Sequence, residues 1–187
     1  MIKKILLLLV ATLIQTHAVE ESMIKQSVDT NIKKVIKVLK NPSLSMKQKE
    51  KKSMKIMDPL FSYPTMAKIS LGKRWKTLSK KERKSFTKAF EHKMKYAYID
   101  KLKLYHDQKV VTSTPKKIKK NRITLTTKVI GSGETFKIVN SFYKKKKTNQ
   151  WYIYDVKLAG VSIIQTYRKQ FSAFLKTKSF QELLNSL

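Results

Sequence analysis

The sequence predicts an α+β domain in which helices pack on one face of a curved antiparallel sheet of about four to five strands and leave an apolar pocket. Three observations predict this fold. Between residues 19 and 105, apolar residues recur every three or four positions, which is the period of amphipathic helices. Between residues 109 and 158 they alternate with polar residues, as in half-buried strands. Helical spacing returns after Ser162, and no linker divides residues 19–187.

The helical part of the chain contains clear helix starts and stops. Ser45 can cap a helix that Asp58-Pro59 ends, and Gly72 can end the next one. Ser79-Lys-Lys-Glu82 fits a capping box, and the apolar stripe that follows it runs for about seven turns. The helical segments expected are residues 19–40, 46–57, 60–71 (a loop and a short helix), 79–105, a long helix capped by Ser162, and residues 180–187.

Five short segments have the alternation of strands. They are residues 109–112, 118–120, 122–129, 135–143 and 151–158. Because short turns join successive segments, we expect an antiparallel meander with one face covered. The turn at residues 144–150 is very basic.

The chain carries 42 Lys and Arg residues against 12 Asp and Glu, a formal net charge of +30. Only four of these cations are arginines. The lysines are hydrated point charges without the guanidinium fork that reads phosphates and guanine bases, and they are spread over all the expected elements. This pattern indicates a solvated basic surface, so we expect no nucleic-acid partner.

The N-terminus has the layout of a secretory signal peptide. Lys3 and Lys4 precede an apolar run from Ile5 to Ile14, and a short polar stretch ends at Ala18. The run is shorter than the roughly 20 residues that span a bilayer. We therefore expect cleavage after Ala18 and a soluble periplasmic product of residues 19–187. The alternative is an uncleaved N-terminal anchor.

The sequence lacks the patterns of common catalytic and metal sites. It has no cysteine, which excludes disulfides, thiol catalysis and zinc–thiolate sites. A Gly-x-Ser-x-Gly elbow and a glycine-rich phosphate loop are also missing. We expect no enzyme and no metal site. The remaining catalytic alternative is an envelope hydrolase in which His106 and Asp107 would meet a nucleophile.

Two carboxylates have positions that need an explanation. Asp58 precedes Pro59 at a helix end, where a turn or cap is the expected role. Asp155 lies in the apolar strand of residues 151–158, where a carboxylate requires a partner. Arg168 on the following helix is the expected partner, and the pair would join the sheet to that helix.

Several motifs occur together in the order and rough spacing of one known family. They are Asp58-Pro-Leu-Phe-Ser-Tyr-Pro-Thr-Met-Ala67, Leu71-Gly-Lys-Arg-Trp75, Leu78-Ser-x-x-Glu82-Arg83-x-x-Phe86, Trp151-x-x-Tyr154-Asp155-Val156, Gly160-Val-Ser162 and Tyr167-Arg168-x-Gln170-Phe171. Together with the signal peptide and the length, they resemble the MlaC family, also called the toluene-tolerance Ttg2D family. The turn at residues 144–150 departs from the family, because it lacks the Gly common there.

The resemblance implies an MlaC-like fold, NTF2-like in general shape, and a monomeric periplasmic phospholipid carrier. In that family the partners are the outer-membrane MlaA lipoprotein complex and the inner-membrane MlaFEDB ABC transporter, reached through MlaD. The assigned role is to maintain the lipid asymmetry of the outer membrane. Bound phospholipid is the cargo, and no cofactor is expected.

A helix-covered, curved sheet rich in large apolar side chains can hold acyl chains, although the same side chains can simply fill a core. The residues expected to line the pocket are Phe61, Met66, Phe90, Met94, Tyr98, Val129, Phe142, Tyr154, Val156, Ile164 and Phe171. The alternative is an exported basic interaction module that binds an anionic membrane surface or an acidic partner and holds no internal cargo.

Overall fold

Six antiparallel strands form one sheet. The computed structural model describes residues 23–102, 105, 107–131 and 133–187, and for residues 97–102 it describes the backbone alone. The strands are β1 (Lys109–Thr112), β2 (Lys116–Lys119), β3 (Arg122–Ile130), β4 (Thr135–Lys145), β5 (Gln150–Leu158) and β6 (Val161–Ser162). Their order is β1-β3-β4-β5-β6, and β2 also pairs with β3. The predicted antiparallel pairing is confirmed, and β3 to β6 follow one another as a meander. The first two strands depart from the expected meander, because β1 and β2 do not pair with each other and both pair with β3.

The sheet has one strand more than the five segments expected. β6 is two residues long and pairs with β5 through Lys157 and Ser162. The chain reverses between these strands at Ala159 and Gly160, whose φ angles are 47° and 85°. A strand of two residues has no alternation to detect, so the sequence pattern did not reveal it.

The helices follow the expected order. They are α1 (Ile24–Leu39), α2 (Met46–Met57), the 3₁₀ turn η2 (Asp58–Leu60), α3 (Tyr63–Leu71), the 3₁₀ turn η3 (Gly72–Thr77), α4 (Lys80–Leu102), α5 (Ile163–Phe174) and α6 (Phe180–Asn185). Among the described residues, none of these helices combines the length and the apolar character that crossing a membrane requires.

The predicted helix caps are present. The Ser45 hydroxyl accepts from the Gln48 amide at 3.3 Å, and the Ser45 amide donates to the Gln48 side chain at 2.9 Å. Ser79 and Glu82 form the same reciprocal capping box at α4. These contacts pair backbone groups that a helix leaves without internal partners, and they define where α2 and α4 begin.

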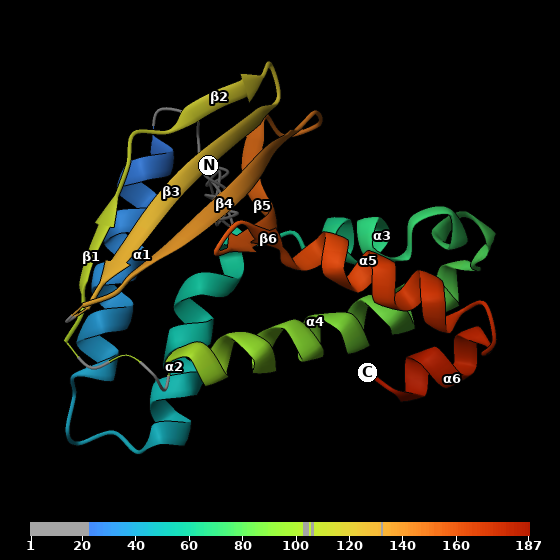
Figure 1. The fold of residues 1–187 in the computed structure, drawn as a ribbon, viewed down its shortest axis with the longest axis horizontal. Helices are drawn as coiled ribbons and strands as arrows, with labels where there is room; N and C mark the ends of the chain where they lie inside the picture. The colour runs from blue at the N-terminus through green and yellow to red at the C-terminus, as the bar shows by residue number, and fades with distance from the viewer. Residues whose placement is uncertain (1–22, 103–104, 106, 132) are drawn as a thin grey trace, which may run out of the picture.

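The first apolar cluster lies between α1 and the sheet, and Figure 1 shows α1 crossing behind β1 and β3. Alternate residues of β3 and β5 face this helix, whose own apolar residues recur at helical spacing. We name this group the sheet cluster. Its buried members are Ile24, Val28, Val35, Met57, Leu60, Ile123, Leu125, Phe142, Trp151 and Ile153.

The second cluster is built mainly by helices. On α4, Phe86, Phe90 and Met94 pack against α3, α5 and α6, which lie beyond the end of the sheet in Figure 1. The Phe86 ring lies 5.8 Å from both the Phe90 and Phe171 rings, measured between centroids. We name this group the helical cluster. Its buried members are Tyr63, Met66, Ala67, Leu71, Leu78, Phe86, Phe90, Met94, Ile164, Phe171, Phe180 and Leu183.

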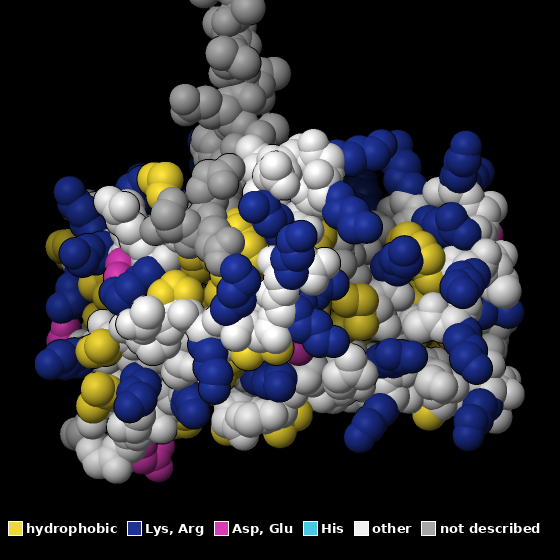
Figure 2. Space-filling model, turned by 90° about the horizontal axis from the view of Figure 1, so that it is seen from above, with side chains coloured by type: hydrophobic (Ala, Val, Ile, Leu, Met, Phe, Trp, Pro, Cys, Tyr) yellow, Lys and Arg dark blue, Asp and Glu magenta, His cyan; other side chains and the backbone are white. Residues whose placement is uncertain are grey.

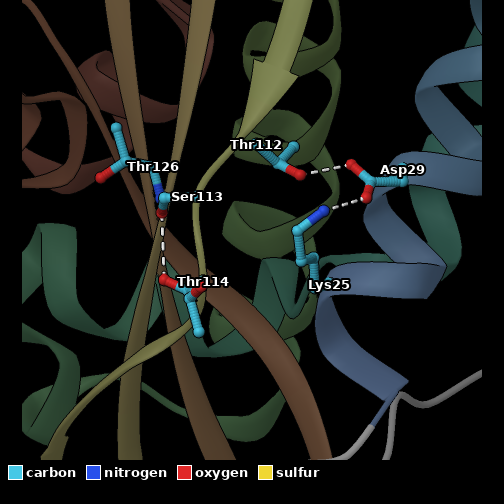
Figure 3. A network of polar contacts seen from close by, with 6 residues as sticks. All are labelled: Lys25, Asp29, Thr112, Ser113, Thr114 and Thr126. Atoms are coloured by element: carbon cyan, nitrogen blue, oxygen red, sulfur yellow. Dashed lines mark hydrogen bonds and ion pairs between the residues drawn. The ribbon is translucent and has the colours of Figure 1, made fainter.

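A polar network fastens α1 to the edge of the sheet (Figure 3). Asp29 on α1 accepts hydrogen bonds from the Thr112 hydroxyl on β1 and, at 2.6 Å, from Lys25 Nζ. Just beyond β1, Ser113 Oγ accepts from the Thr126 amide at 3.2 Å. The first of these contacts joins α1 to β1, and the last joins the segment after β1 to β3.

Candidate functional site

The two clusters meet at Phe61, between η2 and α3. Its half-buried side chain packs against both clusters, and its ring stacks on Tyr63 with the centroids 5.7 Å apart. Phe61 forms a parallel bridge with Ile153 of β5, and the Ser62 amide donates to the Ile153 carbonyl at 2.9 Å. We call this point the junction. It ties the start of the helical cluster to the middle of β5.

The structure distributes the predicted pocket residues over both clusters. Met66, Phe90, Met94, Ile164 and Phe171 belong to the helical cluster.

The sheet contributes the others. Phe142 is buried in the sheet cluster, Val156 packs against that cluster, and Phe61 packs against both. Val129 and Tyr154 are half-buried. The side chain of Tyr98 lies outside the described residues.

Most of these side chains pack within or against the two clusters. Two surface hollows in the described part of the chain can be compared with this set. One lies along α1, from Lys25 to Lys33, and the other lies between the end of α3 and α5, beside Gly72 and Arg168. None of the predicted pocket residues with a described side chain lines either hollow. Their role as a lipid pocket therefore stays a prediction.

An arginine and two tyrosines form a polar cluster beside the junction. Tyr154 occupies a β-bulge, because Ile153 pairs with Phe142 while Asp155 pairs with Ser141. Arg122 Cζ lies 5.1 Å from the centroid of the Tyr154 ring and 5.5 Å from that of Tyr143. This arrangement is a pair of cation–π contacts, and it holds a guanidinium at the surface of the sheet.

The same cluster reaches the helices through the Tyr143 hydroxyl. It lies 3.1 Å from Ser62 Oγ and accepts from Thr65 Oγ1 at 3.0 Å. Arg122, Tyr143, Ser62 and Thr65 were not among the residues predicted from sequence. Their contacts join positions 78 and 81 residues apart, and no local pattern signals such pairs.

The predicted Asp155–Arg168 ion pair is wrong. Asp155 accepts from Ser162 Oγ at 2.7 Å and from the Ile164 amide at 3.2 Å, both at the start of α5. Arg168 instead lies against Gly72, and within the described ranges no ion pair joins it to Asp155. The reason is that a helix N-terminus offers unpaired amide donors, which satisfy a buried carboxylate without a cation. Asp155 still joins the sheet to α5, as expected.

A second carboxylate anchors α4. Asp58 ends α2, as predicted, and its Oδ2 lies 2.6 Å from Lys95 Nζ on α4. Lys95 also contacts Glu91 at 2.6 Å, and the Tyr63 hydroxyl donates to Asp58 Oδ1 at 2.9 Å. Partial burial alone would lower the pKa of Lys95, but the hydrogen bonds to Asp58 and Glu91 outweigh it and raise that pKa above its ordinary value. The network is structural, since it holds charged Lys95 against the helical cluster.

Of the two residues that the hydrolase alternative requires, His106 and Asp107, the structure describes only Asp107. Asp107 lies 2.6 Å from Lys40 Nζ, while His106 lies outside the described residues. In the described ranges, no three His, Asp or Glu side chains gather as a metal site would require.

Similar proteins agree with this fold. A family model described as MlaC protein matches residues 29–187. The intermembrane phospholipid transport system binding protein MlaC of Haemophilus influenzae is 26% identical over 120 residues, which cover 63% of this chain and 56% of that protein. The matched region thus spans a little more than half the length of that relative.

A solved structure gives the likeness in three dimensions. The phospholipid-binding protein from Ralstonia solanacearum, determined in complex with a phospholipid, superposes with a TM-score of 0.73. The two chains are 19% identical, and the superposition covers 86% of this chain and 92% of that one. This likeness supports the fold, and the family match extends over most of the sequence. The chain belongs to the MlaC family.

Proposed function

We propose that this chain is a periplasmic phospholipid carrier that binds lipid without catalysing a reaction. It exchanges lipid with the outer-membrane MlaA complex and, through MlaD, with the inner-membrane MlaFEDB transporter, and so maintains outer-membrane lipid asymmetry. Residues 1–18 act as the signal peptide, and residues 19–187 act as one carrier domain, a monomer without a cofactor. The observation that carries this proposal is membership of the MlaC family, one of whose proteins is named for intermembrane phospholipid transport.

The two-cluster architecture suits an internal cargo. Among the partly buried side chains that the structure describes, Phe61 alone belongs to both the sheet cluster and the helical cluster. Separation of the clusters at this junction exposes apolar side chains on both sides, and acyl chains then replace their mutual contacts. Each buried methylene stabilises the complex by about 0.8 kcal/mol. The predicted lining residues lie on both sides of this junction.

The polar cluster beside the junction provides a place for the headgroup. Arg122 carries five N–H donors in a planar fork, which suits a phosphate diester. The hydroxyls of Tyr143, Ser62 and Thr65 lie within 3.1 Å of one another along the same edge. In this proposal the phosphate stays near water at Arg122 while the acyl chains pass the junction.

Native mass spectrometry tests the proposal directly. Residues 19–187 are purified from a Gram-negative periplasm in high salt, and the lipids of the same sample are extracted. We expect an adduct of phospholipid mass that survives salt, because apolar burial is not screened by ions. A bulky substitution inside the helical cluster, Ile164→Phe, is expected to reduce the adduct. The matched control is Val161→Phe, whose residue is 61% exposed on β6.

The competing function gives a different result. If the chain is an interaction module without cargo, it keeps its unliganded mass after incubation with liposomes. Equal lipid loading of the wild type and Ile164→Phe would contradict the proposed position of the acyl chains. Met66→Phe, on α3 in the same cluster, repeats the test if Ile164→Phe fails to fold.

A further inference from the structure

One end of the sheet concentrates positive charge. Residues 116–120 contain four lysines, and residues 144–147 are four consecutive lysines, with no Asp or Glu in either segment. We name these two segments together the basic tip. Residues 116–120 and 145–147 are exposed, and Lys144 is half-buried. The tip therefore presents its charge to solvent at a single end of the molecule.

The two segments of the basic tip lie side by side. The turn after β2 meets the end of β4 where the Lys144 amide donates to the Asn121 carbonyl at 3.2 Å. This turn and the turn after β4 stand at the top of Figure 1. Figure 2 views the molecule from this side and shows Lys and Arg side chains over the whole face, with few Asp or Glu side chains among them.

An apolar side chain stands in the middle of these lysines. Ile118 is 52% exposed and interrupts the register of β2 against β3, because Lys117 pairs with Ile123 while Lys119 pairs with Arg122. A bulged residue is released from the ladder and can point its side chain away from the sheet. The basic tip thus carries a β-branched apolar group between pairs of cations.

The two lysines at the end of β4 lie close to aromatic rings of β5. Lys144 Nζ lies 5.8 Å from the centroid of the Trp151 ring, and Lys145 Nζ lies 6.0 Å from that of Tyr152. Lysines on β2 can be explained as protection of an exposed sheet edge against association. That explanation does not extend to residues 144–147. Lys144 and Lys145 end β4, which lies between β3 and β5 rather than at an edge, and residues 146 and 147 lie in the turn that follows.

We propose that the basic tip docks the protein on an anionic lipid bilayer. Lysines are hydrated point charges that suit a fluid layer of headgroups better than a fixed set of carboxylates on a protein, for which arginine forks are preferred. Ile118 enters the boundary between headgroups and acyl chains, as apolar residues of interfacial segments do. An acidic protein partner is the competing occupant.

The position of the basic tip relates it to the proposed lipid path. Arg122 pairs with Lys119 of the tip on one side and with Tyr143 on the other. Tyr143 in turn contacts Ser62, next to Phe61 at the junction. Docking through the tip brings the polar cluster close to the bilayer surface. The docking surface is nevertheless separate from the cargo site, so either proposal can fail without the other.

Vesicle flotation tests the proposal with the full mature chain. The probes are vesicles of phosphatidylglycerol mixed with phosphatidylcholine, and vesicles of phosphatidylcholine alone. We expect binding to the first kind only, and weaker binding as salt rises. Each lysine at an anionic surface strengthens binding by about fivefold, so replacement of Lys145, Lys146 and Lys147 by Gln is expected to weaken it by about a hundredfold. Ile118→Ser is expected to weaken it by about fivefold.

The matched control removes the same charge at the opposite end. Lys51, Lys52 and Lys55 are exposed on α2, at the bottom of Figure 1, and their replacement by Gln is expected to leave flotation within about twofold. A second tip variant, with Lys116, Lys119 and Lys120 replaced by Gln, repeats the test if the first fails to fold. Equal losses in tip and control variants would overturn the proposal, because the overall charge and not the tip would then bind the vesicles. No preference for anionic vesicles would also overturn it and would favour an acidic protein partner. Phospholipid adducts measured on the same variants should be unchanged.

Discussion

Replacement of Asp155 by Asn tests how the sheet is joined to α5. Asp155 is only 8% exposed, and its two oxygens accept from Ser162 Oγ at 2.7 Å and from the Ile164 amide at 3.2 Å. Asn keeps the shape but has one acceptor oxygen and no charge. Hydrogen bonds to a charged group contribute about 1.5–3 kcal/mol, and a carboxylate at a helix N-terminus contributes up to about 2 kcal/mol. Since Asn retains part of the first contribution, we expect the free energy of unfolding to fall by about 2 kcal/mol.

Urea unfolding followed by tryptophan fluorescence measures this change. With a slope of about 2 kcal/mol per molar urea, the midpoint should fall by about 1 M. Glu134→Gln is the matched control, because Glu134 is exposed and the substitution alters the net charge equally. The control should change the free energy of unfolding by less than about 0.5 kcal/mol.

Arg168→Gln tests whether Arg168 forms an ion pair with Asp155. Arg168 is exposed and lies against Gly72, so its replacement should also cost less than about 0.5 kcal/mol. If Arg168→Gln destabilised the protein as much as Asp155→Asn, an ion pair would be present after all. If Asp155→Asn cost no more than Glu134→Gln, the argument from the helix N-terminus would be refuted.

Three further substitutions are informative. Thr127→Val removes a buried hydroxyl that has no hydrogen-bond partner within the described residues, so the free energy of unfolding in urea should rise by about 1 kcal/mol. A fall would show that the hydroxyl is satisfied. Gly72→Ala forces a side chain at φ 57° and should cost about 1 kcal/mol by the same titration, whereas an unchanged midpoint would contradict that strain. Burial raises the pKa of Asp29, but hydrogen bonds from Lys25 and Thr112 outweigh it and hold the pKa below its ordinary value. Ionised Asp29 therefore stabilises the folded protein above about pH 4, and this stabilisation is lost as pH falls through the folded-state pKa. The difference in the free energy of unfolding between wild type and Asp29→Asn should become smaller between pH 7 and pH 3. A constant difference would contradict this linkage.

Local chemistry made much of the fold predictable. Ser45 and Ser79 start helices because their caps are formed by residues three positions away, within reach of sequence inspection. The same signal at Ser179 and Glu182 caps α6, which begins at Phe180, where the last helical segment was expected to begin. The alternation of β3 and β5 likewise depends on each strand having one face against α1.

The bulge at Tyr154 shows why the direction of the β5 side chains was harder to predict than the strand itself. Strict alternation puts Tyr154 and Val156 on one face of β5. The bulge shifts the register by one residue, so Val156 packs on the sheet cluster while Asp155 turns toward α5. A shift of one residue exchanges the faces of every side chain that follows, and it depends on the partner strand as much as on the strand's own sequence.

The sequence by itself determined the helices and strands, their order, the basic surface and the motifs of the MlaC family, because each of these depends on residues close together in the sequence or on composition. Only the tertiary structure decided that the apolar residues form two clusters meeting at Phe61. It also decided that Tyr143 contacts Ser62 and that Asp155 is satisfied by a helix N-terminus. The physical reason is that these contacts join distant segments, whose pairing is selected by packing and by satisfaction of buried polar groups across the whole fold.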